Sequence, residues 1–354
     1  MASGVTSTIR AVSALGTPPF QTLDPFLFCV YHKDQYPPGN TRMEAPRVGN
    51  GADFDPSAPY RMYHGDRIPG FPQHPHRGFE TITATMEGVI DHTDSMGNGG
   101  RYGDGDLQWM TAGGGVVHGE MFPLVNQTSD NPTRFFQIWL NLPAKNKMCE
   151  PSFKMHWAQQ VNKVTRDDGS SLTLFAGEYK GLNGEAPPPN SWAADPSNEV
   201  SIYHITLPPN SKIKIPSTTT EGVNRTLYMI EGTEGVIDGV SFKSKVYAVI
   251  DPSKALTLSN PPTSSSSTEF LVLSGVSISE PVAQRGPFVM NTQSEIMQAF
   301  RDYQSTQFGG WPWPEDAMVF EKEKGRFAFF DGVESTPDDV EGKRREGISK
   351  AGEL

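Results

Sequence analysis

Two short segments in the first third of the chain carry side chains that could bind a metal. His74 and His76 form one pair and His118 and Glu120 form another, each pair with one residue between its members. Residues two apart on a β-strand point to the same face, so two such strands side by side would aim three imidazoles and one carboxylate at one point. These ligands suit a divalent transition metal, most naturally non-haem iron(II).

Two other readings of these residues remain open. A single His-x-His pair is weak evidence, and the four side chains could be polar groups hydrogen-bonded at the rim of a barrel. Burying three imidazoles and a carboxylate without a metal would nevertheless be costly. A closed structural zinc site is the other alternative, but such sites are mostly rich in cysteine, and neither Cys29 nor Cys149 lies near these residues in the sequence.

The segments that must position these side chains have the pattern of β-strands. The chain contains 35 glycines and 30 prolines, scattered between short apolar or alternating runs. That pattern is typical of an all-β barrel or sandwich. The glycine runs at 97–100 and 113–115 predict loops. The expected strands are residues 79–86, 107–110, 135–142, 201–207, 226–230, 246–250 and 269–276.

One helix is expected late in the chain. Thr292 and Glu295 have the spacing of a capping box, and Ile296, Phe300 and Tyr303 then mark one helical face.

The length of 354 residues suggests two domains. We assign residues 1–160 to a metal-binding N-terminal domain, 164–312 to a C-terminal domain without a metal motif, and 313–354 to a partly mobile extension. The second domain contains His204 as its single histidine. The metal site is therefore expected in the first domain alone.

Composition narrows the class of protein. The formal net charge of −11 argues against binding to nucleic acid or to anionic membranes. No apolar run approaches the roughly 18 residues that span a bilayer. Two cysteines argue against a disulfide framework and fit a reducing compartment. Residues 1–20 weakly resemble an organellar transit peptide, but their alternation favours a first strand, so organellar targeting is not expected.

The two metal segments resemble the motifs of the cupin superfamily. Residues 74–88 are similar to the first motif and 113–118 to the end of the second. Three features depart from the usual pattern. The spacing before Gly88 is one residue longer, Thr111 stands where proline is common, and Glu120 follows the histidine.

These departures resemble one cupin family, the pirins. The similarity runs from about residue 20 to about residue 310 and is strongest at 70–81 and 105–113, with further similar blocks at 23–27, 137–142 and 286–292. The resemblance implies an all-β fold of two cupin barrels packed face to face, with few short helices. It also implies one iron(II) per chain in the N-terminal barrel.

The resemblance also implies the ligands and the chemistry. Pirin ligands fall on His74, His76, His118 and Glu120, whereas Glu80, a ligand in many other cupins, would either be structural or support a ligand without binding the metal. Copper, nickel, manganese or cobalt would accept the same ligands. Four protein ligands on a six-coordinate metal leave two positions open, which indicates chemistry or sensing.

Some pirins resemble quercetin 2,3-dioxygenases, which open a flavonol ring with O2 and release carbon monoxide. Glu120 would then also be the catalytic base for the flavonol 3-hydroxyl. An apolar slot for the substrate would be formed by residues near the ligands in sequence, with Gln137 orienting a ligand or water. The candidates for the apolar slot are Phe71, Met86, Trp109 and Met121. Each of them, and Gln137 as well, could equally be an ordinary barrel residue.

The resemblance leaves a second class of function open: an iron-dependent redox-sensing transcriptional cofactor, or a signalling adaptor, acting through protein–protein binding. The partner would then be a protein such as a transcription factor, and the acidic charge would favour basic partners over DNA. Arg77 would point away from the ligands and influence the redox or surface electrostatics of the site. We expect a monomer in the cytoplasm, the nucleus or both. A flavonol-sized cavity would favour the enzyme.

Overall fold

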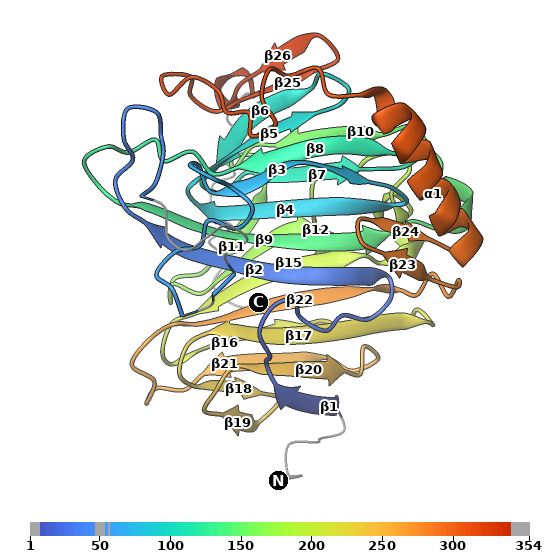
Figure 1. Cartoon of the computed structure of the whole chain (residues 1–354). Coiled ribbons are helices and arrows are strands. Elements are labelled where there is room, and N and C mark those ends of the chain that lie inside the picture. Colours follow the sequence, from blue (N-terminus) through green and yellow to red (C-terminus); the bar gives the residue numbers. More distant parts are fainter. Residues whose placement is uncertain (1–7, 47–53, 56, 341–354) are drawn as a thin grey trace.

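The computed structural model describes residues 8–46, 54–55 and 57–340. Its strands stack into two barrels, with the first half of the chain above and the second half below in Figure 1. The α-helix α1 (Gln293–Thr306) lies beside the upper barrel. The expected all-β fold class is confirmed. None of the helices in the described part of the chain has the length and apolar character needed to cross a membrane.

The first barrel is built from two antiparallel sheets. In spatial order, one contains β10 (Ser152–His156), β7 (Leu107–Thr111), β4 (Phe79–Glu87), β9 (Asn131–Asn141) and β2 (Phe26–Tyr36). The other contains β26 (Val333–Ser335), β25 (Phe327–Phe330), β6 (Gly99–Gly103), β5 (Val89–Asp94), β8 (Val116–Met121) and β3 (Gly70–His76). The candidate metal ligands therefore lie on the neighbouring strands β3 and β8.

The second barrel also has two main sheets. The larger contains β1 (Ile9–Ala14), β20 (Val246–Ile250), β17 (Val223–Glu231), β22 (Thr268–Val276), β15 (Ser201–Leu207), β12 (Ser171–Ala176) and β11 (Asn162–Thr165). The smaller contains β16 (Ser211–Ile215), β21 (Leu256–Asn260), β18 (Gly235–Ile237) and β19 (Val240–Phe242). Two short hairpins pair β13 (Glu178–Tyr179) with β14 (Leu182–Asn183), and β23 (Ala283–Arg285) with β24 (Phe288–Met290).

Short 3-10 helices occupy the connections: η1 (Ala144–Asn146), η2 (Trp192–Ala194), η3 (Pro196–Asn198), η4 (Gln307–Gly309) and η5 (Pro337–Asp339).

Each end of the chain crosses into the other half. Strand β1 pairs with β20 of the second barrel, and β25 pairs with β6 of the first. The domain bounds remain a prediction, and this exchange was not anticipated from the sequence. The rest of the expected extension, residues 341–354, lies outside the described residues.

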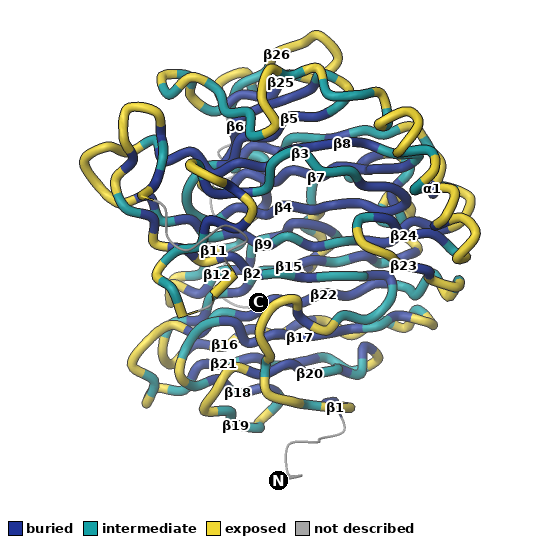
Figure 2. The backbone as a smooth tube through the Cα atoms, viewed as in Figure 1, coloured by how far each residue is buried: buried dark blue, intermediate teal, exposed yellow. Residues whose placement is uncertain are grey.

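A hydrophobic core joins the two barrels. Phe136 and Ile138 of β9 pack in one cluster with Ile202 of β15 and Leu271 of β22, and all four are fully buried. In Figure 2 the strands of this middle layer are mostly buried or intermediate along their length. Because side chains alternate along a strand, the other face of β9 is left for the interior of the first barrel. We call this cluster the shared core.

Most expected elements are present. Each of the seven expected strands matches an observed strand, with small differences at the ends. Helix α1 begins with the predicted capping box of Thr292 and Glu295.

The loop predicted at 97–100 is wrong in its second half, because Gly99 and Gly100 belong to β6. A Cβ atom on Gly100 would lie 2.5 Å from the Phe327 carbonyl oxygen. Glycine therefore lets β25 approach β6 closely.

Candidate metal centre

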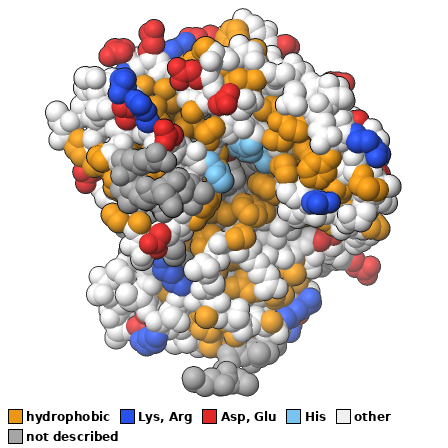
Figure 3. Space-filling model, viewed as in Figure 1, with side chains coloured by type: hydrophobic (Ala, Val, Ile, Leu, Met, Phe, Trp, Pro, Cys, Tyr) orange, Lys and Arg blue, Asp and Glu red, His pale blue; other side chains and the backbone are white. Residues whose placement is uncertain are grey.

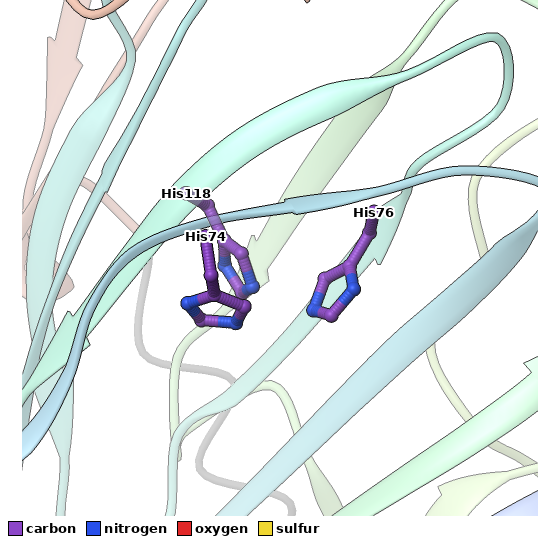
Figure 4. Close-up of side chains that lie close together, drawn as sticks. All are labelled: His74, His76 and His118. Carbon is purple, nitrogen blue, oxygen red and sulfur yellow. The ribbon is translucent and has the colours of Figure 1, made fainter. Parts of the chain in front are cut away.

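Strands β3 and β8 bring three histidines together. His74 lies directly opposite His118 in the antiparallel pairing, and a register shift between Phe71 and His74 bends β3 beside the site. Each histidine of the set His74, His76 and His118 offers a nitrogen, and these nitrogens lie within 4.8 Å of one another. Figure 4 shows the three rings gathered in one place. The three imidazoles could therefore bind one metal ion.

The three imidazoles are neutral at physiological pH. Burial lowers the pKa of His74 to about 4. Burial, together with the neighbouring imidazoles, holds the pKa values of His76 and His118 well below their usual range. Neutral imidazole is the form that binds a metal, so the site is ready to accept a cation.

Backbone carbonyls orient two of the rings. His74 Nδ1 lies 2.9 Å from the Pro72 carbonyl oxygen, to which it can donate, so Nε2 keeps its lone pair for a metal. His76 Nδ1 lies 3.4 Å from the carbonyl oxygen of Pro287, in the turn between β23 and β24. A turn in the second half of the chain therefore helps to position a candidate ligand of the first barrel.

His118 supports the presence of a metal most directly. It is fully buried, and among the described residues neither of its ring nitrogens has a hydrogen-bond partner. A buried polar group without a partner is costly and calls for an explanation such as a bound ion. The three histidines therefore fit a metal ion, and iron(II) among others accepts imidazole ligands.

Glu120 lies two residues after His118 and, together with His74 and His76, lines a cavity. Its carboxylate accepts hydrogen bonds from Thr83 Oγ1 at 3.1 Å, Tyr102 OH at 3.3 Å and Gln137 Nε2 at 2.6 Å. Burial raises its pKa. The carboxylate does not belong to the compact group formed by the three imidazoles. Its role as a fourth ligand and as a base therefore stays a prediction.

A cavity of about 800 Å³ opens beside the histidines. Figure 3 shows histidines at a hollow ringed by hydrophobic side chains. The aromatic and apolar wall includes Phe28, Val30, Phe71 and Trp139, and its polar groups include His32. Concave, mostly apolar sites with a few polar groups are typical of small-molecule pockets.

The structure separates the expected substrate residues into two groups. Phe71 and Gln137 line the cavity. Met86 and Trp109 do not: Trp109 is fully buried in the shared core and Met86 packs against that core. Trp109 pairs with Ile82, which faces the same core, and a register shift at Met86 interrupts β4. Met121 is also buried outside the cavity.

Arg77 and Glu80 have structural partners. Arg77 is buried and its Nη1 lies 2.6 Å from Asp302 Oδ2 of α1. The guanidinium joins the end of β3 to the helix, and its expected influence on the redox or surface electrostatics of the site stays a prediction. Glu80 accepts hydrogen bonds from Thr111 and Ser191 at 2.7 and 2.6 Å. It lies outside the histidine group, as expected for a structural residue.

Several residues of the site were missed from the sequence. Thr83 could have been predicted from the sequence, because it lies four residues after Phe79 and therefore on the same face of β4. His92 and Tyr102 had no local signal. His92 lies opposite Glu120 in the pairing of β5 with β8, and its ring centroid is 5.5 Å from that of His118. The pairing of β5, β6 and β8 brings these side chains to the site.

Comparisons with known proteins agree with this architecture. The chain matches the Pirin family model over residues 8–140 and the Pirin C-terminal cupin domain model over residues 202–309. It is 39% identical over 237 residues to a Pirin-like protein of Solanum lycopersicum, covering 66% of this chain and 75% of that protein. It is 32% identical over 261 residues to human Pirin, covering 73% and 84%.

Among solved structures, a quercetin 2,3-dioxygenase from Acinetobacter baumannii superposes with a TM-score of 0.66 and 28% identity, over 86% of this chain and 96% of that one. The two family models match successive parts of the chain that correspond to the two barrels. The protein therefore belongs to the pirin family and is a bicupin, with an N-terminal pirin domain and a C-terminal cupin domain.

Proposed function

We propose that the protein is an iron-dependent quercetin 2,3-dioxygenase, which opens the central ring of a flavonol with O2. One observation carries this proposal: the histidine group of β3 and β8 opens into a large, aromatic-lined cavity. A relative of similar architecture is named as a quercetin 2,3-dioxygenase.

The cavity favours an enzyme over a purely regulatory protein. Its volume of about 800 Å³ is in the range of small-molecule sites. Phe71 and Trp139 supply flat apolar surfaces for an aromatic ligand, and few polar groups compete with them. A protein that acted by partner binding alone would need no such cavity.

The side chains have distinct roles in this proposal. His74, His76 and His118 hold the metal. Iron(II), when bound, supplies a Lewis acid that lowers the pKa of the flavonol 3-hydroxyl and a centre at which O2 and the flavonol can meet. Glu120 accepts the proton of that hydroxyl, and burial, which raises its pKa, makes it a better base. Gln137 holds the carboxylate in place.

The test is oxygen-dependent loss of quercetin by iron(II)-loaded protein, with carbon monoxide as the measured product. We expect turnover in the wild type and none above background in His118→Ala, which removes a ligand. His156→Ala is the matched control, because His156 is also a buried histidine but lies on β10 outside the cavity. It should keep its iron and its activity.

One result of the same experiment would refute quercetin as the substrate. If the wild type binds one iron per chain and produces no carbon monoxide from quercetin, the proposed substrate is wrong. The regulatory alternative, with iron acting as a redox switch for binding a protein partner, would then be favoured.

A further inference from the structure

A chain of hydrogen-bonded side chains runs along the cavity wall on the side of β2. Arg61 Nε donates to Asp34 Oδ1 at 2.8 Å, and Tyr63 OH donates to Asp34 Oδ2 at 2.8 Å. His32 Nδ1 lies 2.8 Å from the hydroxyl oxygen of Tyr63. His32, Arg61 and Tyr63 all line the cavity. None of these four residues has a role in the proposed reaction.

The direction of each hydrogen bond in this chain is determined. The Asp34 carboxylate also accepts from the Arg61 backbone N–H at 2.9 Å, so with a guanidinium beside it this group is an acceptor. Tyr63 has one hydroxyl proton and gives it to Asp34. The hydroxyl oxygen must then accept from His32. The proton of the neutral imidazole therefore sits on Nδ1, and Nε2 carries the lone pair.

His32 keeps this form at physiological pH. Burial, together with the positive charge of Arg61, lowers its pKa to about 3. The ring is also held in place, because it stacks on Phe135 with ring centroids 4.3 Å apart. None of the hydrogen bonds made by the described residues uses Nε2. A fixed acceptor therefore remains at the cavity wall.

We infer that His32 Nε2 accepts a hydrogen bond from a hydroxyl group of the ligand, so that the cavity selects polyhydroxylated aromatic molecules. The identity of the ligand as a flavonol rests on the proposed function. His32 lies on β2, in the sheet opposite the histidines of β3 and β8. The ligand hydroxyl that it binds is therefore a different group from the 3-hydroxyl at the metal, and we call it the remote hydroxyl. His32 is a positioning residue.

The selectivity follows from the orientation of the chain. A ligand without the remote hydroxyl would cover Nε2 and leave this acceptor buried without a partner. Sites built to bind a hydroxyl strongly reject ligands that lack it. The substitution His32→Phe would keep the stacking on Phe135 and remove the acceptor. The ligand preference should then disappear while the shape of the cavity is kept.

The experiment compares quercetin with 3-hydroxyflavone, which keeps the 3-hydroxyl and lacks the others. Dissociation constants are measured by anaerobic titration of iron(II)-loaded protein and of metal-free protein. We expect the wild type to prefer quercetin by about tenfold or more. His32→Phe should bind the two compounds with affinities within about twofold. In Tyr63→Phe the imidazole is free to change tautomer. The ratio of the two dissociation constants should therefore fall at least twofold from its wild-type value.

His64→Phe is the matched control. His64 lines the same cavity but is exposed and lies outside the hydrogen-bonded chain. The same substitution there should keep the preference for quercetin. Circular dichroism establishes that each variant is folded, and Tyr63→Phe carries the test if His32→Phe is not.

The outcomes separate this inference from the proposed function. A preference that depends on His32, without any turnover, would support the inference and refute the dioxygenase. Turnover of both flavonols with equal affinities in the wild type, or a preference that survives in His32→Phe, would overturn the inference. Failure to bind either flavonol would overturn both.

Discussion

At the scale of the residue, the buried carboxylate of Glu120 is held by three hydrogen-bond donors. Its donors Thr83, Tyr102 and Gln137 come from three different strands. Hydrogen bonds to a buried carboxylate restrict its position and partly offset the cost of burying it. Such a group can take a proton from a ligand without first having to reorganise.

We expect Glu120→Gln to lower kcat for quercetin by about 100-fold or more, because an amide is not a base. Iron should remain bound through the three histidines. Kinetics combined with metal analysis measures both effects. Glu150→Gln is the control, since Glu150 is an exposed carboxylate away from the cavity. If kcat in Glu120→Gln stayed within a few-fold of the wild type, another group would have to be the base.

At the scale of the element, helix α1 supports β3, the strand that carries the candidate ligands His74 and His76. Arg77, one residue after His76, is buried and forms an ion pair with Asp302 of the helix. The guanidinium also lies over the ring of Phe308, 4.6 Å from its centroid. This contact fixes the end of β3 that carries His76.

Replacing Arg77 by methionine should destabilise the protein by about 1–3 kcal/mol, less than a fully buried pair would cost because Asp302 is partly exposed. Iron affinity should fall as well, because β3 loses its tether. Urea unfolding and iron titration measure the two effects. Arg301→Met is the control on the same helix, where the hydrogen-bonded partner is Gln298. A destabilised Arg77→Met protein with unchanged iron affinity would contradict the role of α1 in the site.

Strand β4 carries a buried carboxyl group whose protonation depends on pH. Glu80 is fully buried between Thr111 of β7 and Ser191 of the second half of the chain. Burial raises its pKa to about 7, although both hydroxyls lower it. The folded protein therefore holds a proton that the unfolded chain, in which a glutamate has its ordinary pKa of 4.5, releases.

This raised pKa predicts how stability changes with pH. The contribution of Glu80 is fully present below about pH 4.5 and is lost as pH rises to about 7. Glu80→Gln cannot ionise, so its unfolding free energy should exceed that of the wild type by an amount that grows between pH 5 and pH 8, on the order of 2–3 kcal/mol. Denaturant unfolding at several pH values measures this difference. A difference independent of pH would show that Glu80 does not titrate in this range.

At the scale of the whole molecule, the shared core links the two barrels, and we expect them to unfold as one cooperative unit. Leu271 of β22 belongs to the second half of the chain but packs in the same cluster as Phe136 and Ile138 of the first. The exchange of β1 and β25 adds backbone pairing in both directions. A barrel that unfolded alone would expose the face of its neighbour.

Leu271→Ala should lower the unfolding free energy by about 2–5 kcal/mol, as expected for a large-to-small change in a core. Hydrogen exchange at increasing urea should show β9 and β22 losing protection together, both earlier than in the wild type. If β22 lost protection while β9 kept its wild-type midpoint, the barrels would be independent domains and the shared core would not couple them.

The sequence by itself determined the features that depend on local pattern. The spacing of His74 and His76 predicted that both rings point to one face of a strand, because alternation along a strand is a local property. The structure brings His118 to the same place, as predicted for a candidate metal site. The strands and the capped helix α1 follow equally from local periodicity and from Thr292 and Glu295.

The tertiary structure alone decided which strand faces line the cavity. Trp109 and Met86 lie close to the ligands in sequence but face the shared core, whereas His32 is distant in sequence and lines the cavity. The same is true of the pairing of β1 and β25 with the opposite halves. The reason is physical: an amphipathic pattern shows that a strand has two faces, but which neighbour covers each face depends on pairing between segments far apart in the chain.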